Sequence, residues 1–291
     1  MIHPCVWHDG TALAAAEHYA AVFPDGAIAE RSPTPDAETP PTVVTCRLAG
    51  APLMLLNGGP HFRPNPSISA MVRCGEAALV DELWRGLTEG APEPLMPLGS
   101  YAWSPRYGWL RDRWGFTWQL MHDETLPAGA AAELSPALLF TGERFGRAAG
   151  ALGRYAAVLP DSGEPSIEAY ADDSPSPGKV LFGELGFAGG GRLVAMDGPG
   201  EHAFAFGEGV SLVVHCADQA ELDAVWDGLI AGGGTPSRCG WLRDAFGVSW
   251  QVLPQGLSTW LADPDTGPAA MRALMTMDKL DIARLHPDPG A

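Results

Sequence analysis

Two glutamines, Gln119 and Gln251, hold the same place in two copies of one motif. The motif is GWLRDRWGFTWQL over Gly108–Leu120 and GWLRDAFGVSWQV over Gly240–Val252, with 8 of 13 residues identical. A side-chain amide carries both donors and an acceptor, so it can orient a polar ligand. The alternative is a structural amide paired with neighbouring backbone, since buried polar groups usually have a partner of one kind or the other.

Aromatic residues surround these glutamines in the sequence. Trp118 and Trp250 directly precede them, and side chains alternate along a strand. We therefore expect both tryptophans on the opposite face, in the core. Trp103 lies in a loop rich in Gly, Pro and aromatic residues, and it is the better candidate for a pocket wall because small-molecule sites combine aromatic walls with a few polar groups.

Histidine and cysteine supply the remaining reactive groups. His202 follows a Gly/Pro turn near Phe204, where it could be a general base at a cavity rim or an exposed loop residue. The cysteines number 5, and no CxxC or Cys/His cluster occurs. This predicts neither a disulfide framework nor a zinc site. Cys239 has Tyr107 as its counterpart, which excludes a nucleophile shared by both copies.

The elements that position these residues also occur twice. Tyr19–Asp25 returns as Tyr155–Asp161 with 6 of 7 residues identical, and Val72–Gly90 returns as Val214–Gly232 with 8 of 19 identical. A unit of this length is a whole domain, whereas solenoid repeats span about 20–50 residues. Pairing two such copies creates a pseudo-symmetric interface, and ligands commonly bind at clefts of this kind.

Each copy is predicted to hold two strand–helix–strand–strand–strand units. Apolar periodicity and turn signals place the helices and the long loops. The helices are expected at Ala12–Val22, Glu76–Glu89, Arg147–Val158 and Gln219–Ala231, and the loops at Gly90–Arg106 and Ser162–Lys179.

The repeat divides the chain into four parts. A first domain is expected over 1–125, a linker over 126–135, a second domain over 136–262 and a C-terminal helical tail over 263–291. The tail has no counterpart in the first copy, and docking on the body is the expected role of its apolar side.

Composition limits the classes of partner. The chain has 291 residues and a formal charge of −17, which argues against nucleic acid and anionic membranes as partners. No segment approaches the roughly 20 apolar residues of a membrane span, and the N-terminus lacks the basic and apolar regions of a signal peptide. We expect a cytoplasmic protein with a small-molecule ligand, either a monomer that mimics a dimer or a homodimer.

Several motifs together resemble a known family. They are YAAVFPD at Tyr19–Asp25, a Gly-Gly-Pro at 58–60, the repeated GWLRD with its following Trp-Gln, and MTMDKLDIA at Met275–Ala283. The chain resembles PhnB-like proteins of the vicinal-oxygen-chelate superfamily, which includes glyoxalases and bleomycin-resistance proteins and often carries a demethylubiquinone methyltransferase-type label. The resemblance implies an α+β fold of two tandem domains, each with two βαβββ modules that form a cupped mixed sheet around a cavity.

The resemblance also implies where a metal would bind. Metal-using members take His and Glu ligands from the first and last strands of modules, and these positions fall at His3 and Gln119 in the first copy. In the second copy they fall at Ser135 and Gln251, so neither copy has a complete His/Glu set. Transition-metal sites usually need imidazole or carboxylate ligands. A divalent metal is therefore not favoured, and His3 and Gln119 are the candidates if one binds.

A small-molecule-binding protein or enzyme is the function that the resemblance implies, with lyase or isomerase chemistry if it is catalytic. The alternatives are a non-catalytic protein that sequesters its ligand, and a structural or regulatory protein with a vestigial cavity. Methyl transfer finds no support in the residues, because Gly186–Gly191 joins two predicted strands and does not open a helix. The expected ligand-binding residues are Asn57, Trp103 and Gln119 in the first copy and Asp197, His202 and Gln251 in the second.

Overall fold

The computed structural model describes residues 2–34, 36, 38–126 and 131–286. Four βαβββ modules follow one another in this part of the chain. Module 1 consists of β1 (Ile2–His8), α1 (Ala12–Val22), β2 (Ala27–Arg31), β3 (Val43–Leu48) and β4 (Ala51–Asn57). Module 2 consists of β5 (Ile68–Cys74), α2 (Ala77–Leu87), β6 (Met96–Tyr101), β7 (Ser104–Arg111) and β8 (Thr117–His122).

The second repeat has the same order of elements. Module 3 consists of β9 (Ala132–Phe140), the short 3-10 helix η1 (Gly142–Arg144), α3 (Ala148–Val158), β10 (Ser166–Ala169), β11 (Val180–Gly186) and β12 (Arg192–Asp197). Module 4 consists of β13 (Val210–Cys216), α4 (Gln219–Ile230), β14 (Thr235–Pro236), β15 (Trp241–Arg243) and β16 (Ser249–Pro254). The tail contributes α5 (Leu257–Ala262), α6 (Gly267–Leu274) and α7 (Ile282–Leu285).

The modules form two mixed eight-stranded sheets. Sheet A has the order β14-β15-β16-β13-β1-β4-β3-β2, and sheet B has the order β10-β11-β12-β9-β5-β8-β7-β6. The α+β class and the two tandem copies are thus confirmed. The expectation was that the two modules of each copy share one sheet. In the structure, sheet A joins modules 1 and 4, and sheet B joins modules 2 and 3. The segment between β4 and β5 is long enough to carry the chain from one sheet to the other.

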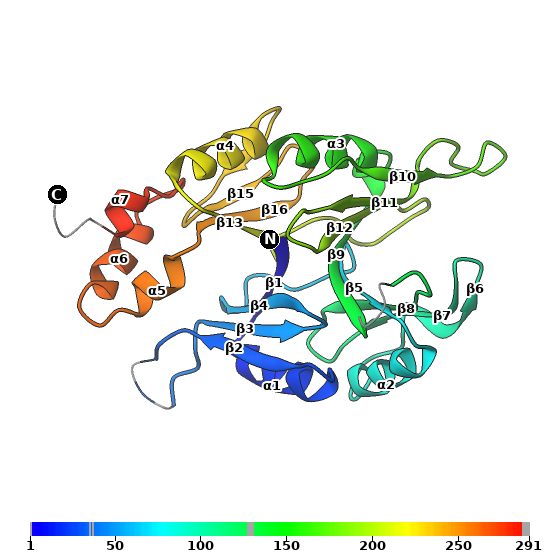
Figure 1. Ribbon diagram of the computed structural model, residues 1–291, viewed down its shortest axis with the longest axis horizontal. Helices are drawn as coiled ribbons and strands as arrows, with labels where there is room; N and C mark the ends of the chain where they lie inside the picture. The colour runs from blue at the N-terminus through cyan, green and yellow to red at the C-terminus, as the bar shows by residue number, and fades with distance from the viewer. Residues whose placement is uncertain (1, 35, 37, 127–130, 287–291) are drawn as a thin grey trace.

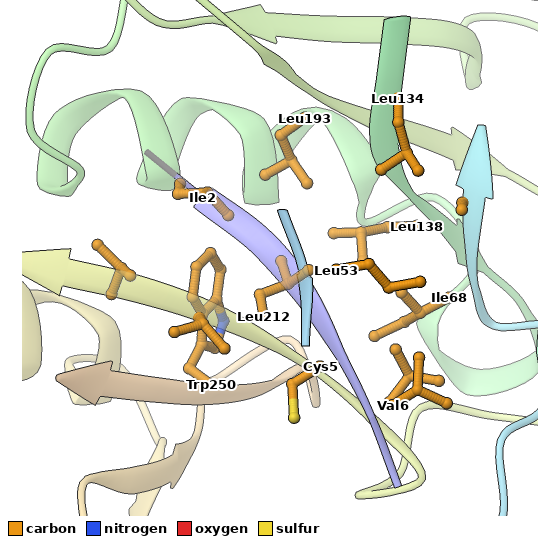
Figure 2. Close-up of a cluster of buried hydrophobic side chains, with 14 of the residues drawn as sticks. Ile2, Cys5, Val6, Leu53, Ile68, Leu134, Leu138, Leu193, Leu212 and Trp250 are labelled. Atoms are coloured by element: carbon orange, nitrogen blue, oxygen red, sulfur yellow. The ribbon is translucent and has the colours of Figure 1, made fainter. Parts of the chain in front are cut away.

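The main core lies between the two sheets. Ile2 and Val6 of sheet A and Ile68 and Leu138 of sheet B point into it, and all are less than a tenth exposed (Figure 2). Figure 1 shows α1 with α2 on one side of the molecule and α3 with α4 on the opposite side. The helices cover the same faces of the sheets that supply the core, so the odd-numbered residues of β1 belong to the face without helices.

The helix-free face of each sheet is concave. Arg73 on β5 forms an ion pair with Glu184 on β11 at 3.5 Å, although β9 and β12 lie between these strands. Three strand spacings of about 4.8 Å separate them along a flat sheet, so the pair requires the sheet to curl toward this side. Each face without helices is called the concave face of its sheet below.

Two of the edge strands lie in segments that the sequence predicts to be loops. The expected loop Gly90–Arg106 contains β6, and the expected loop Ser162–Lys179 contains β10. Both strands pair with irregular register, which weakens the alternation that predicts a strand. Of the expected linker 126–135, residues 127–130 lie outside the described residues and β9 already begins at Ala132. The domain boundaries stay a prediction.

The tail docks on module 4. The backbone N–H groups of Cys239 and Gly240 donate to the carbonyls of Met277 and Asp278 at 2.7 and 2.8 Å. Gln219 at the start of α4 donates to the Leu280 carbonyl and accepts from Ile282 N–H. None of the helices that the structure describes has the length and apolar character needed to cross a membrane.

Candidate functional site

Gln119 lies on the concave face of sheet B within a chain of hydrogen bonds. The Tyr107 hydroxyl donates to Gln119 Oε1 at 2.8 Å, and Gln119 Nε2 donates to Ser69 Oγ at 2.7 Å. The chain crosses three adjacent strands, β7, β8 and β5. Burial raises the pKa of Tyr107, so its phenol remains a donor at neutral pH. The amide is thereby fixed in one orientation.

An apolar cluster lies beside these polar residues, separate from the main core. Met71, Ala137 and Val194 form its buried floor, on β5, β9 and β12. Met121, Phe182 and Met196 cover the floor and are only partly buried. Methionine side chains are flexible and polarisable and adapt to irregular shapes. The concave face of sheet B therefore has an adaptable apolar surface at its centre.

Aromatic residues connect the cluster to solvent. Trp103 is 56% exposed and stacks on Tyr101, with ring centroids 5.0 Å apart. Both rings also form T-shaped contacts with the Tyr107 ring. The centroid of that ring lies 5.4 Å from the Trp103 centroid and 5.5 Å from the Tyr101 centroid. An aromatic wall thus leads from the surface to the hydroxyl that donates to Gln119.

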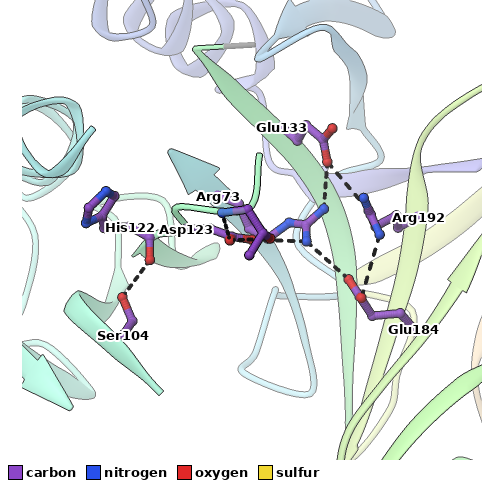
Figure 3. Close-up of polar contacts among 8 residues, drawn as sticks. Arg73, Ser104, His122, Asp123, Glu133, Glu184 and Arg192 are labelled. Atoms are coloured by element: carbon purple, nitrogen blue, oxygen red, sulfur yellow. Dashed lines mark hydrogen bonds and ion pairs between the residues drawn. The ribbon is translucent and has the colours of Figure 1, made fainter. Parts of the chain in front are cut away.

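An ionic cluster closes one end of the same face (Figure 3). Arg73 contacts Glu133 at 2.6 Å, Asp123 at 3.2 Å and Glu184 at 3.5 Å. Arg192 contacts Glu133 and Glu184 at 3.5 and 3.7 Å. Two guanidinium groups face three carboxylates, so the cluster keeps one net negative charge, and its ion pairs give this end of the face a fixed wall.

Two further donors lie on β7. Trp109 is the cross-strand partner of Gln119, and Arg111 is the partner of Thr117. Trp109 Nε1 and Arg111 Nε are buried without a hydrogen-bond partner among the described residues. Both N–H groups can donate to a ligand oxygen near Gln119.

The concave face of sheet A has diverged from that of sheet B. Gln251 Nε2 donates to Ser211 Oγ at 2.9 Å, as Gln119 does to Ser69, but Cys239 replaces Tyr107. His3 and His215 approach each other with their Nε2 atoms 3.2 Å apart. Burial, and then the neighbouring His215, lowers the pKa of His3 to about 3, so its imidazole is neutral at pH 7.

The candidate metal ligands His3 and Gln119 do not come together, although His3 shares sheet A with Gln251. His3 lies on β1 in sheet A, whereas Gln119 lies on β8 in sheet B. Ser135 is the residue that shares sheet B with Gln119, and it offers no imidazole. No group of three His, Cys, Asp or Glu residues in the described part of the chain is arranged to hold a metal ion. The residues present do not fit a metal site of this type.

Asn57 and Asp197 brace the starts of two helices. Asn57 accepts from Ala12 N–H at 3.1 Å and donates to the Pro41 carbonyl at 2.8 Å. Asp197 accepts from three N–H groups, of Gly146, Ala148 and Val180, at 2.8, 3.2 and 2.9 Å. Their polar atoms are bonded to backbone groups away from the concave faces.

The six expected ligand residues therefore lie in five places, two of which are the helix starts at Asn57 and Asp197. Trp103 and Gln119 share the concave face of sheet B, Gln251 lies on that of sheet A, and His202 lines a separate hollow. The alternation of side chains along β7 and β8 places Tyr107 on the same face as Gln119, so Tyr107 could have been predicted from the sequence as a site residue. The apolar cluster and Arg73 could not be found this way, because their partners come from modules 2 and 3.

Comparison with known proteins places these features in context. A family model described as 3-demethylubiquinone-9 3-methyltransferase matches residues 1–121 and 132–253. A search of the curated proteins gives no match.

Solved structures cover one or both repeats. A putative 3-demethylubiquinone-9 3-methyltransferase, PhnB protein, from Bacillus cereus is 27% identical, with 41% of this chain and 96% of that chain covered and a TM-score of 0.38. A mutant glyoxalase I from Zea mays is 13% identical, with 87% of this chain and 92% of that chain covered and a TM-score of 0.53. The maize protein shares the fold across both repeats.

Proposed function

The chain belongs to the 3-demethylubiquinone-9 3-methyltransferase family and has the vicinal-oxygen-chelate fold, and from this premise we propose that it binds a small, largely apolar molecule on the concave face of sheet B. The observation that carries the proposal is the apolar cluster around Met71. A floor of three buried residues under three partly exposed ones is separate from the main core. Apolar surface with a few convergent polar groups is typical of small-molecule sites.

The polar residues beside the cluster favour a ligand with an oxygen function. Gln119 is held by Tyr107 and Ser69, and the Trp109 N–H, which has no partner among the described residues, lies on the neighbouring strand. A carbonyl or hydroxyl oxygen could accept from Trp109 or from the second Gln119 N–H while the apolar body covers Met121 and Phe182. Fixed donors reduce the ordering cost of binding.

Binding without methyl transfer is the activity proposed. Gly186–Gly191 turns between the antiparallel strands β11 and β12, whereas a dinucleotide-type or methyl-donor loop would open a helix. On sheet A, the neutral buried His3 is too weak a base for proton abstraction at pH 7. A sequestering role therefore fits the residues better than a catalytic one.

A neutral fluorescent amine, N-phenyl-1-naphthylamine, tests the site. We expect saturable binding to the full chain, and Met121→Lys should weaken it by about tenfold or more, because an ammonium in an apolar site is costly. Met54→Lys is the matched control, since Met54 is a partly buried methionine on β4 of sheet A. Equal loss of affinity in both variants, or no binding at all, would contradict the proposal.

A ketone-bearing probe then separates the polar contacts from the apolar ones. Prodan carries a carbonyl on a similar naphthalene body. Gln119→Ala should weaken prodan binding by about tenfold and leave the amine probe unchanged, since a neutral hydrogen bond contributes about 0.5–1.5 kcal/mol and the substitution also frees Tyr107. Unchanged prodan binding would make the amide purely structural.

A further inference from the structure

A hollow of about 500 Å³ lies outside the concave face of sheet B. Three segments border it: the end of β9 with η1, the segment between β12 and β13, and the β15–β16 hairpin. Its walls therefore come from modules 3 and 4, near the place where the chain passes from sheet B to sheet A. The lining includes Arg144, Arg243, Glu143, His202, Phe204 and Phe206.

The charge of this hollow differs from that of the whole chain. Arg144 and Arg243 outnumber the one lining carboxylate, Glu143, whereas the chain as a whole carries −17. Neither arginine forms an ion pair with any described residue. Arg144 Nη1 donates only to the Ala245 carbonyl, at 3.1 Å. Both guanidinium groups thus keep donors for an anion, and arginine binds carboxylate and phosphate through two parallel N–H groups.

The apolar wall of the hollow is held in place. Thr141 Oγ1 donates to the Phe204 carbonyl at 3.1 Å, and His202 packs on the Phe204 ring at 5.1 Å. Phe206 meets Phe140 edge-on at 4.9 Å, which ties the loop to the core. A fixed aromatic wall in the same hollow as two arginines suits a ligand with a ring and an anionic group.

We infer that this hollow binds a small aromatic oxyanion, a phosphate monoester or a carboxylate. Arg243 and Arg144 hold the oxyanion, and Phe204 packs against the ring. The site does not depend on the concave face of sheet B, with which it shares no residue. Arg111, the counterpart of Arg243 in the first repeat, lies on β7 with its Nε buried, whereas Arg243 lines the hollow.

Calorimetric titration of the full chain with phenyl phosphate at low salt tests this inference. We expect saturable binding of one molecule per chain, weaker binding of inorganic phosphate and none of phenol. Arg243→Gln should weaken phenyl phosphate by about tenfold or more, as expected for loss of a charged hydrogen bond. Arg272→Gln, which removes one charge from the exposed surface of α6, should leave the affinity unchanged.

Two further titrations identify the ligand groups. Phe204→Ala should weaken phenyl phosphate and leave inorganic phosphate unchanged. A titration with benzoate, compared with that of phenyl phosphate, shows whether a carboxylate or a phosphate monoester binds more tightly. Saturable binding of either anion supports the site. Absence of saturable binding by both anions, full affinity in Arg243→Gln, or equal losses in Arg243→Gln and Arg272→Gln would overturn it. Unchanged circular dichroism of Arg243→Gln excludes misfolding as the cause of a loss.

Discussion

Asp112 and Asp244 accept hydrogen bonds from the same four kinds of donor in the two repeats. Asp244 receives the Tyr155 hydroxyl at 2.6 Å, Trp250 Nε1 at 2.9 Å and two backbone N–H groups of the β15–β16 turn. Burial raises the pKa of Asp244, and the four donors oppose that rise by stabilising the charged form. The most strongly repeated motif therefore connects a helix, a turn and a strand. Its recurrence indicates a role in stabilising the fold and not a role in catalysis.

Removing one hydrogen-bond donor to Asp244 measures how much this bond contributes to the free energy of unfolding. Tyr155→Phe should lower the free energy of unfolding by about 1.5–3 kcal/mol, because a hydrogen bond to a buried charged group is lost without a replacement. Tyr101→Phe is the control, since the exposed Tyr101 hydroxyl donates only to the Pro97 carbonyl. Urea denaturation gives both values. A Tyr155→Phe midpoint equal to that of the control would show that the repeated Tyr–Asp pair contributes nothing to stability.

Elements differ in how far the sequence could predict them. Helices α1 and α3 form where apolar periodicity placed them, and Trp118 and Trp250 are buried on the helix-covered face as alternation requires. Strands β6 and β10 were missed because short, irregular edge strands resemble loops. The ionic cluster around Arg73 was not predictable, since its members come from strands far apart in the chain and no local pattern connects them.

The docking of the tail includes two hydrogen bonds from one side chain of α4. Gln219 donates to the Leu280 carbonyl at 3.1 Å and accepts from Ile282 N–H at 2.8 Å. Gln219→Ala should remove both bonds at a cost of about 1–3 kcal/mol and speed amide exchange over residues 274–285. Gln255→Ala, at an exposed position, should leave exchange unchanged. Unaltered exchange in the Gln219 variant would mean that the Gln219 hydrogen bonds contribute nothing to the docking of the tail.

At the scale of the whole molecule, the partition of modules could not be predicted from the sequence. The central strands β1, β5, β9 and β13 are all short and largely buried, and each could pair with several of the others. The repeat defines four modules but not which two share a sheet. In the structure, β1 pairs with β13 and β5 with β9, so every sheet needs strands from both repeats.

This pairing predicts that the two repeats fold only together. Coexpression of residues 1–126 and 127–291 as separate chains should yield a complex that copurifies through a tag on either piece. Neither piece alone should remain a monomer, because each would expose unpaired central strands. Light scattering after size-exclusion chromatography gives the masses. A stable monomeric half would show that the partition between the sheets is wrong.

A protein assembled from two identical chains inherits every mutation twice, so both of its ligand pockets change together. Here one gene encodes two unlike concave surfaces, one with His3 and His215 and the other with Met71 and Arg73. Natural selection can therefore alter the specificity of one surface while the other stays as it is. Covalent fusion of the copies lets a mutation change one concave surface without changing the other.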